Sequence, residues 1–339
     1  MDETHDDMWS DRSPTCPGSA WRHCLNLAVL APSLLNTQPW RFHVHAGGVD
    51  VFSDPERRLD AVDPRGREMV LSVAAAIFNL RVAMLAHGRQ PLVAALPEPT
   101  QTNLLARVTL GPSVQPDRMM RASAQAIPER HTSRLPFADT IVPTDVLAGL
   151  ADAAHVKGCG LAEADDIGRM LVLGLVRRAE QKLRAESSYR AALARWTGPA
   201  VGAREGVSSE EFGPWDALEE MPIRDLGLVH PGANRQRTHF ESKPTITVLY
   251  TNGDTAHEWL QAGQALQRVL LTATVHGLSA TPLTQPLEIP ELRDRLNDPR
   301  DGRIVPQIVL RLGYGPPAPP SRRRPLNDVL RAGNRTTRR

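Results

Sequence analysis

One order of elements occurs twice in this sequence, and it limits the fold more than any other feature. In the first half, an Ala- and Leu-rich helix predicted over 67–88 ends in His-Gly, and a strand-like segment ending in Leu-Gly follows at 104–111. In the second half, a strand at 246–250, a helix ending in His-Gly at 276–277 and a strand from 307 have the same order. Histidine complements the negative end of a helix dipole, and glycine caps helices in the left-handed conformation. The sequence therefore predicts an internal repeat.

The second copy is longer than the first. The two His-Gly pairs, which end at 88 and 277, lie 189 residues apart, whereas the strand ends at 111 and 313 lie 202 apart. The second copy thus gains 13 residues between helix and strand, in the region of TPLTQPLEIPELRDRL at 281–296. Because connecting segments often carry function, this region is a candidate site.

The composition narrows the class of protein. The chain has 339 residues, 41% of them hydrophobic, which is enough for one large domain or two. Its 40 basic and 38 acidic residues nearly cancel, so charge does not indicate nucleic acid or membrane as a partner. The basic end at 321–339 has no aromatic side chains to stack on bases and is typical of a solvated tail.

The cysteines favour a reducing compartment, and the N-terminal sequence does not resemble a signal peptide. Cys16, Cys24 and Cys159 have no CxxC spacing, and an odd number favours neither a disulfide framework nor a zinc site. No apolar run follows basic residues at the N-terminus, and the long apolar helices contain Arg or Asn. We therefore expect a cytoplasmic protein without a signal peptide, membrane span or metal site.

Several shorter elements are predicted from local signals. A helix over 20–31 should stop before Pro32, because the residue before proline disfavours the helical conformation. Strands at 41–45 and 49–53 should form a hairpin at Gly47-Gly48, a pair suited to positive φ. A helix is expected over 144–155, and one long helix from 166 to the residue before Gly198.

Residues 199–242 show no sustained periodicity and contain Gly-Pro, Met-Pro and His-Pro-Gly breaks. A loop of this length is usually a functional lid or disordered. Disordered segments have low hydrophobicity. The segment instead contains apolar side chains that favour packing, so we expect a lid: Trp215, Met221, Ile223, Leu226 and Leu228.

Two basic clusters are candidate phosphate sites. RHTSR at 130–134 combines two guanidinium groups with two hydroxyls, the donors that a phosphate needs, although a solvated turn can have the same composition. SRRRP at 321–325 is a second guanidinium cluster, after the strand that ends at Gly313.

Three segments together resemble the motifs of the nitroreductase superfamily of FMN enzymes. PSLLNTQPWRF at 32–42 resembles its P-S-x-x-N-x-Q-P-W-x-F motif, and RHTSR resembles its R-[RH]-[ST]-x-[RK] phosphate motif. GYGPPAPPSRRRPLNDVL at 313–330 resembles its C-terminal Gly-Tyr-Pro and Arg-Lys-Pro-Leu element. The order differs from that of ordinary nitroreductases, in which the phosphate motif comes first and two chains pair. It is similar to that of the dormancy-associated, Acg-type nitroreductase-like flavoproteins of actinobacteria, in which one chain folds as a fused pseudo-dimer.

The resemblance implies an α+β nitroreductase fold with two fused half-repeats, each a mainly antiparallel sheet flanked by helices. The halves would span 19–125 and 126–330, with the lid at 199–242, a disordered lead at 1–18 and a basic tail at 331–339. Both a monomeric pseudo-dimer and a homodimer stay open.

The resemblance also implies one FMN per chain, because each half supplies what the other lacks. Pro32, Ser33, Leu34, Asn36 and Gln38 belong to the loop near the isoalloxazine ring, with the Asn36 amide facing its polar edge. The FMN phosphate would be held by Arg130, Thr132 and Arg134 with Arg322 or Arg323, and Thr281, Pro282 and Leu283 would lie near flavin N5. Trp40 and Phe42 are expected in the core.

Two functions follow as alternatives. In the first, NAD(P)H reduces the flavin, which then reduces a nitroaromatic or quinone, and no protein side chain is assigned as acid or base. In the second, the lid closes over FMN and the protein stores the flavin with little or no turnover. The sequence does not decide whether NADH or NADPH is the donor, or which small molecule is the acceptor. It predicts no nucleic-acid or membrane partner.

Overall fold

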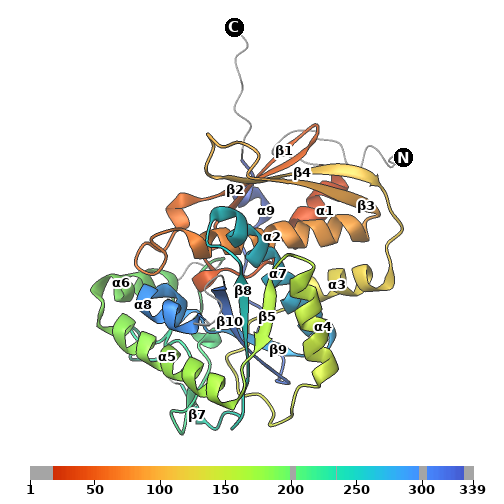
Figure 1. Cartoon of the computed structure of the whole chain (residues 1–339). Helices are drawn as coiled ribbons and strands as arrows, with labels where there is room; N and C mark the ends of the chain where they lie inside the picture. Colours follow the sequence, from red (N-terminus) through yellow and green to blue (C-terminus); the bar gives the residue numbers. More distant parts are fainter. Residues whose placement is uncertain (1–17, 199–203, 234, 298–303, 332–339) are drawn as a thin grey trace.

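The structure is a computed structural model that describes residues 18–198, 204–233, 235–297 and 304–331. Of the predicted lead at 1–18 and the predicted tail at 331–339, residues 1–17 and 332–339 lie outside these ranges. Two antiparallel sheets, one from each half of the chain, lie on either side of two long helices, α2 (Arg67–Ala86) and α7 (Ala256–Val275) (Figure 1). The molecule is therefore α+β, as predicted.

The first sheet contains β1 (Trp40–His45), β2 (Gly48–Ser53), β3 (Arg89–Ala95) and β4 (Leu104–Ser113), in the order β1-β2-β4-β3. Trp40, Phe42 and Val44 alternate along β1 with less buried residues and pack against α1 (Ser19–Ala28) and α2, so the core assignment of Trp40 and Phe42 is confirmed. β1 and β2 form the predicted hairpin, but its two turn residues are Ala46 and Gly47 rather than Gly47-Gly48, because His45 already pairs with Gly48. Gly48 has φ +152°, and a Cβ there would lie 2.1 Å from the Val108 carbonyl oxygen.

The second sheet contains β5 (Gly160–Glu163), β8 (Thr245–Thr251), β9 (Ser279–Pro282) and β10 (Val305–Gly313), in the order β5-β8-β10-β9. α4 (Thr144–His155), at its predicted position, packs with α7 on this sheet. In both sheets the long helix follows the second strand, and the next strand lies at the far edge. The predicted repeat of strand, helix and strand is thus confirmed at the level of elements.

The two long helices cross where equivalent positions of the two copies meet. Ala74 and Gly263 are 189 residues apart, the same separation as the two His-Gly ends. A Cβ on Gly263 would lie 2.2 Å from the Leu71 carbonyl oxygen and 2.6 Å from the Ala74 Cβ, so only glycine permits this approach. Contact between equivalent residues is what an approximate two-fold axis between the copies produces.

By length and composition α2 could cross a membrane, but 78% of its apolar window is buried inside the protein. It packs against α7, α1 and the first sheet. Its uniform hydrophobicity is therefore explained by its central position.

Three boundaries differ from the predictions. The helix expected from 166 to Gly198 is two helices, α5 (Asp166–Ala185) and α6 (Ser187–Trp196), because Glu186 between them is extended, with φ −77° and ψ 125°. The first helix ends at Ala28 rather than at Pro32. The boundary placed between residues 125 and 126 lies inside α3 (Arg118–Glu129), which packs on both long helices.

Two insertions distinguish the second copy. Between β5 and β8 the segment 164–244 stands where the first copy has a two-residue turn, and it contains α5, α6, β6 (Trp215–Asp216) and β7 (Arg237–Thr238). Between β9 and β10 lies α8 (Pro290–Arg293). The first residues of the predicted insertion, Thr281 and Pro282, belong to β9.

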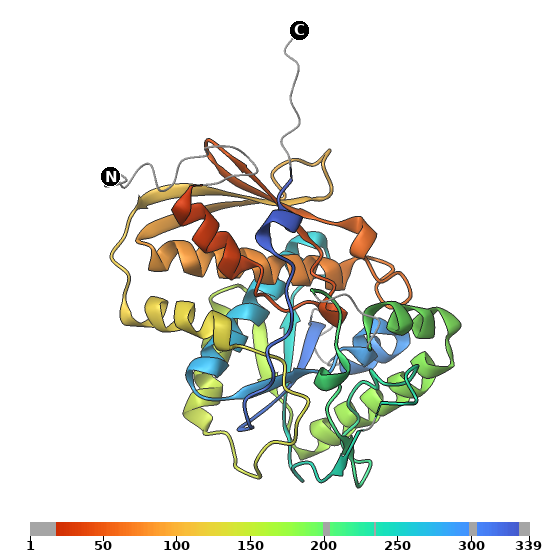
Figure 2. The same cartoon turned by 180° about the vertical axis from the view of Figure 1, so that it is seen from behind.

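The end of the chain runs from the second sheet back to the first (Figure 2). Its short helix α9 (Leu326–Val329) packs on α1 and β1, and the Arg331 N–H donates to the Phe42 carbonyl at 2.7 Å. This path places the arginines at 322–324 beside the loop that follows α1.

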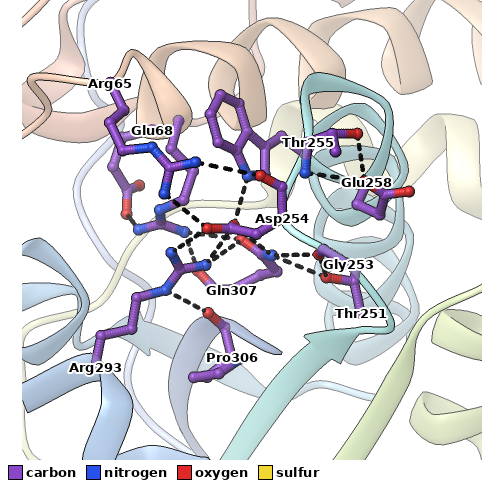
Figure 3. Close-up of polar contacts among 12 residues, drawn as sticks. Arg65, Glu68, Thr251, Gly253, Asp254, Thr255, Glu258, Arg293, Pro306 and Gln307 are labelled. Carbon is purple, nitrogen blue, oxygen red and sulfur yellow. Dashed lines mark hydrogen bonds and ion pairs between the residues drawn. The ribbon is translucent and has the colours of Figure 1, made fainter. Parts of the chain in front are cut away.

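A polar network ties the start of α2 to the second half (Figure 3). The Asp254 carboxylate accepts from Arg293 at 2.8 and 2.9 Å and from Arg65 at 2.8 Å. Burial alone would raise the pKa of Asp254, but hydrogen bonds from these groups outweigh it and hold that pKa well below its usual range. Arg67 donates to the backbone and side-chain oxygens of Gln307 in β10 at 2.7 and 3.2 Å.

Candidate functional site

A cavity lies where the N-terminal half of α2 and α7 meet β9, β10 and the loop after α1. Protein atoms leave about 770 Å³ empty there, a space that includes its opening to solvent. Its walls are formed by Pro32, Ser33, Leu34, Leu35, Glu68, Leu71, Ser72, Ala75, Thr132, Arg134, Ile223, Arg224, Leu226, Leu266, Thr281, Pro282, Thr284 and Ile308.

Residues from three predicted segments meet in these walls. They are Pro32, Ser33 and Leu34 of the first motif, Thr132 and Arg134 of RHTSR, and Thr281 and Pro282 of the insertion. Ile223, Arg224 and Leu226, from the segment predicted to be a lid, also line this cavity. We call residues 204–233 and 235–242 the covering segment, or cover.

The loop after α1 has an unusual backbone. Leu35, Asn36 and Gln38 have φ of 48°, 53° and 51°, in the left-handed region that residues other than glycine rarely adopt. The Ser33 hydroxyl accepts from the Gln38 N–H at 2.9 Å, and the Ser33 carbonyl accepts from the Asn36 N–H at 2.9 Å. Such strain persists only where the surroundings fix it, and it concentrates at functional sites.

The amides of Asn36 and Gln38 do not line the cavity, which corrects the expectation that Asn36 faces a ring. Asn36 Nδ2 donates to the carbonyls of Gly206 and Arg322 at 2.8 and 3.0 Å, and its Oδ1 accepts from Arg323 at 3.0 Å. Gln38 Nε2 donates to the Arg204 carbonyl at 2.9 Å, and its Oε1 accepts from the Arg324 N–H at 2.7 Å. Both amides therefore fasten the segment at 204–206 and the C-terminal segment to this loop.

RHTSR is joined directly to β9. The Ser133 N–H donates to the Ala280 carbonyl at 3.0 Å, and the Thr281 hydroxyl donates to the Ser133 carbonyl at 2.5 Å. These bonds bring Thr132 and Arg134 to the cavity wall beside Pro282.

Outside the lining of this cavity, two guanidinium groups lie together without an ion-pair partner among the described residues. Arg130 and Arg323 each donate to the Leu30 carbonyl at 3.3 Å, and the Nε of each is buried with no hydrogen-bond partner. Burial lowers the pKa of Arg130 to about 9, and the charge of Arg323 adds to the shift. Burial lowers the pKa of Arg323 to about 10, with Glu211 opposing it. Buried cations in this state favour a bound anion.

The remaining predicted residues divide by position. Arg134 lies in the cavity wall and donates to the Glu211 carbonyl at 2.9 Å, and burial lowers its pKa to about 10. Of the two C-terminal alternatives, Arg323 lies with Arg130, whereas the Arg322 side chain is exposed. Leu283 is fully buried in the second sheet's core and does not reach the cavity, contrary to expectation.

Sequence reasoning missed Glu68, in the first turn of α2. Its carboxylate lies in the cavity wall, pairs with Arg67 and is 5% exposed, next to the Asp254 network in Figure 3. Burial raises the pKa of Glu68 to about 7, against the opposing charge of Arg67. An acidic residue at a helix N-terminus is common, and only the packing around it distinguishes this one.

Arg224 was also missed, and it fixes the covering segment. Its guanidinium donates to the hydroxyls of Thr284 at 2.9 Å and Tyr189 at 3.1 Å and pairs with Glu288. Burial alone would lower the pKa of Arg224, but the charges of Glu288, Tyr189 and Glu180 and the hydrogen bond to Glu288 together outweigh burial and raise it. Phe212 and Leu226 of the same segment are buried with Tyr189, so the cover is packed and bonded at several points.

Comparisons with known proteins agree on one family. The model of the nitroreductase family matches residues 127–314. A Mycobacterium tuberculosis protein named "Putative NAD(P)H nitroreductase Rv3131" is 35% identical over 91% of this chain and 90% of its own length. Another from the same organism, "Putative NAD(P)H nitroreductase acg", is 31% identical over 91% of this chain and 94% of its own.

Among solved structures, a nitroreductase with bound FMN from Bacteroides fragilis is 13% identical and covers 60% of this chain and 92% of its own, with a TM-score of 0.35. That likeness is too weak to add to the family match.

Proposed function

Because the chain belongs to the nitroreductase family and is an oxidoreductase of that type, we propose that it binds FMN, which NAD(P)H reduces and which then reduces a nitroaromatic or quinone. The observation that carries the proposal is the pair of guanidinium groups of Arg130 and Arg323, whose buried Nε atoms have no partner and which share the Leu30 carbonyl, two residues before Pro32 of the cavity wall. FMN when bound supplies the electron and hydride chemistry, and the protein supplies orientation, electrostatics and access.

The residues present fit the phosphate of such a cofactor. Arg130 and Arg323 have buried Nε groups without partners, and Arg134 and the Thr132 hydroxyl lie on the adjacent wall. A doubly charged phosphate would supply the acceptors these donors lack, through charge-assisted hydrogen bonds of about 1.5–3 kcal/mol each. We therefore assign the phosphate to Arg130, Thr132, Arg134 and Arg323.

The cavity walls fit a flat aromatic ring with one polar edge. Leu71, Ala75, Leu266 and Ile308 form an apolar floor, and the backbone of the Pro32 loop and of Thr281–Pro282 supplies polar groups at the side. Ile223 and Leu226 of the cover exclude water from the same space. With a pKa of about 7, the Glu68 carboxyl is partly protonated near neutral pH, so the charge of this wall depends on pH.

The arrangement supports one FMN per chain with complementary halves, 19–125 and 126–330. The loop at 32–38 comes from the first half, whereas RHTSR, β9 and the C-terminal arginines come from the second. The ratio of flavin absorbance to protein concentration measures this stoichiometry. We further propose a cytoplasmic protein, supported by its balanced charge and unpaired cysteines.

Storage of the flavin is a second candidate, favoured by the number of bonds that hold the cover shut. Carbonyls at Arg204, Gly206 and Glu211 accept from Gln38, Asn36 and Arg134, and Arg224 is anchored to Glu288. A cover held in this way would shield bound FMN from NAD(P)H.

Anaerobic stopped-flow absorbance of the FMN-loaded protein with NADH and with NADPH tests the proposal. Rapid bleaching of the flavin band, followed by recovery on addition of a nitroaromatic or quinone, is the expected result for the oxidoreductase. If FMN stays bound and oxidised with both nucleotides, the oxidoreductase proposal is wrong and flavin storage is favoured. Failure to bind FMN at all would overturn both.

A further inference from the structure

A second cavity lies farther along α2, beside its C-terminal half, whereas the one described above is lined by the N-terminal half. It is enclosed by the C-terminal halves of α2 and α7 together with α3 and α4, which Figure 1 shows as neighbours at one side of the molecule. Protein atoms leave about 1500 Å³ of it empty, including its opening to solvent. The two cavities share no lining residue.

Three cationic side chains converge on this cavity: Arg81, Lys157 and Arg268. Arg81 donates to the Gln264 side chain at 2.5 Å, and the Lys157 ammonium lies 5.1 Å from the centre of the Phe78 ring. Within the described ranges, none of the three forms an ion pair with a carboxylate. Burial lowers the pKa of all three groups, and it lowers that of Lys157 to about 7 with further effect from Arg81 and Arg268.

Two carboxylates at the cavity do not offset these charges. Asp117 caps α3, where its Oδ1 accepts from the Met120 N–H at 2.7 Å. Asp152 is exposed on α4. The pKa of Lys157 responds to the two arginines rather than to either carboxylate. The cavity therefore has a net positive wall.

The rest of the wall is apolar. Phe78, Val82 and Leu271 are nearly buried and form one hydrophobic cluster, and Leu85 and Met120 extend it toward the opening. A phosphate or another small inorganic anion would meet the cations but leave this surface uncovered. A ligand with both an anionic group and an apolar body would satisfy both.

We infer that this cavity is a binding site for an amphipathic organic anion, an acyl or aryl carboxylate whose charged group contacts Arg81, Lys157 and Arg268 and whose apolar body packs on Phe78, Val82 and Leu271. The inference does not depend on the proposed flavin chemistry, because the site shares no residue with that cavity. The site uses the half of α2 that the first cavity leaves free, and its α7 residues follow Leu266 of the first cavity in the chain.

Calorimetric titration of decanoate into the full-length protein, with FMN present in excess, tests the inference. We expect saturable binding, about tenfold weaker in Lys157→Met and in Arg268→Met, since each removes a charge and keeps most of the apolar stem. Arg121→Met, on the exposed face of α3, is the matched control and should bind like the wild type. Decyltrimethylammonium, with the same chain and the opposite charge, should not bind.

The wild type alone provides a second test that needs no variant to fold. Because Lys157 loses its proton as pH rises through about 7, decanoate affinity should fall between pH 6 and 9. His276 also lines the cavity and could titrate in this range. The variant His276→Gln should keep the same pH dependence of decanoate affinity if Lys157 is responsible. Decanoate affinity that is the same in wild type, Lys157→Met and Arg268→Met, or equal binding of decyltrimethylammonium, would overturn the inference. So would affinity that does not change with pH.

Discussion

Arg130 and Arg323 keep their charges where the described protein places no carboxylate within hydrogen-bond distance. Both donate to one carbonyl, that of Leu30, and each leaves a buried Nε without a partner. The pKa values of both arginines are lowered for the same reason: burial penalises the charged form of each group. At the scale of the residue, burial of these two charges without a carboxylate costs free energy, which a bound anion would offset.

Replacing Arg130 should therefore have opposite effects on FMN binding and on the stability of the apoprotein. Arg130→Met should weaken FMN binding by roughly 10- to 100-fold, since each charge-assisted hydrogen bond contributes about 1.5–3 kcal/mol. The apoprotein should become more stable, because an uncompensated buried cation is removed. Calorimetric titration of FMN and thermal unfolding of the apoprotein measure the two effects.

The neighbouring arginine provides the control. Arg322 is exposed, so Arg322→Met should change neither quantity. FMN affinity in Arg130→Met equal to that of the wild type would remove the phosphate assignment.

Glu68 makes stability depend on pH. Its pKa in the folded protein, about 7, lies above the ordinary value of 4.5, so its stabilising contribution is complete below about pH 4.5 and is lost as pH rises through 7. Glu68→Gln should flatten this decline by roughly 1–3 kcal/mol in the free energy of unfolding. Urea unfolding at several pH values from 5 to 8 measures it, with the exposed Glu56→Gln as control. An unchanged slope in Glu68→Gln would contradict the assignment.

At the scale of the element, the covering segment is held mainly through its own backbone carbonyls. Asn36 and Gln38 bond to Gly206 and Arg204, so the loop after α1 and the cover are one bonded unit. Phe212 and Leu226 bury the cover in a hydrophobic cluster with Tyr189 and Trp196. Deleting the whole segment would expose that cluster, so a single change is the sharper test.

Asn36→Gly removes the amide and keeps a residue that tolerates φ 53°. Residues 204–206 should then exchange amide hydrogens faster and be cleaved faster by trypsin after Arg204. If the cover limits access, reduction of bound flavin by NAD(P)H should speed up as well. Asn26→Ala, an exposed change on α1, is the control. Protection at 204–206 identical to that of the wild type would show that the amide does not hold the cover.

At the scale of the whole molecule, the crossing of α2 and α7 brings together the two halves that build the cavity. α2 supplies Glu68 and Leu71 to its wall and α7 supplies Leu266, so their approach sets the cavity's width. The approach depends on Gly263, where a Cβ would meet the Leu71 carbonyl oxygen.

Gly263→Ala should therefore destabilise the protein by about 1–3 kcal/mol, the usual effect of overpacking, and weaken FMN binding. Gly174→Ala, also inside a helix but with nothing within 4 Å of the added Cβ, should stabilise it by about 0.5–1 kcal/mol. Urea unfolding of both variants measures the contrast. A stability gain in Gly263→Ala as large as that in Gly174→Ala would show that the helices can separate freely.

The sequence by itself determined the features that depend on neighbours along the chain. The repeat, the hairpin of β1 and β2, the helix at 144–155 and the core positions of Trp40 and Phe42 all follow from periodicity, turn residues and caps. The family motifs also indicated which segments would meet, and Ser33, Thr132 and Thr281 do meet at one cavity.

Only the tertiary structure decided how individual side chains in those segments are used. Asn36 and Gln38 bond to carbonyls some 170 residues away, Leu283 turns into the core, and Arg323 rather than its neighbour Arg322 joins Arg130. Glu68 becomes a titratable wall of the cavity only because β10 and the covering segment bury it. The physical reason is that burial and pairing depend on groups brought together by folding, whereas residue type and spacing fix only what each side chain is able to do.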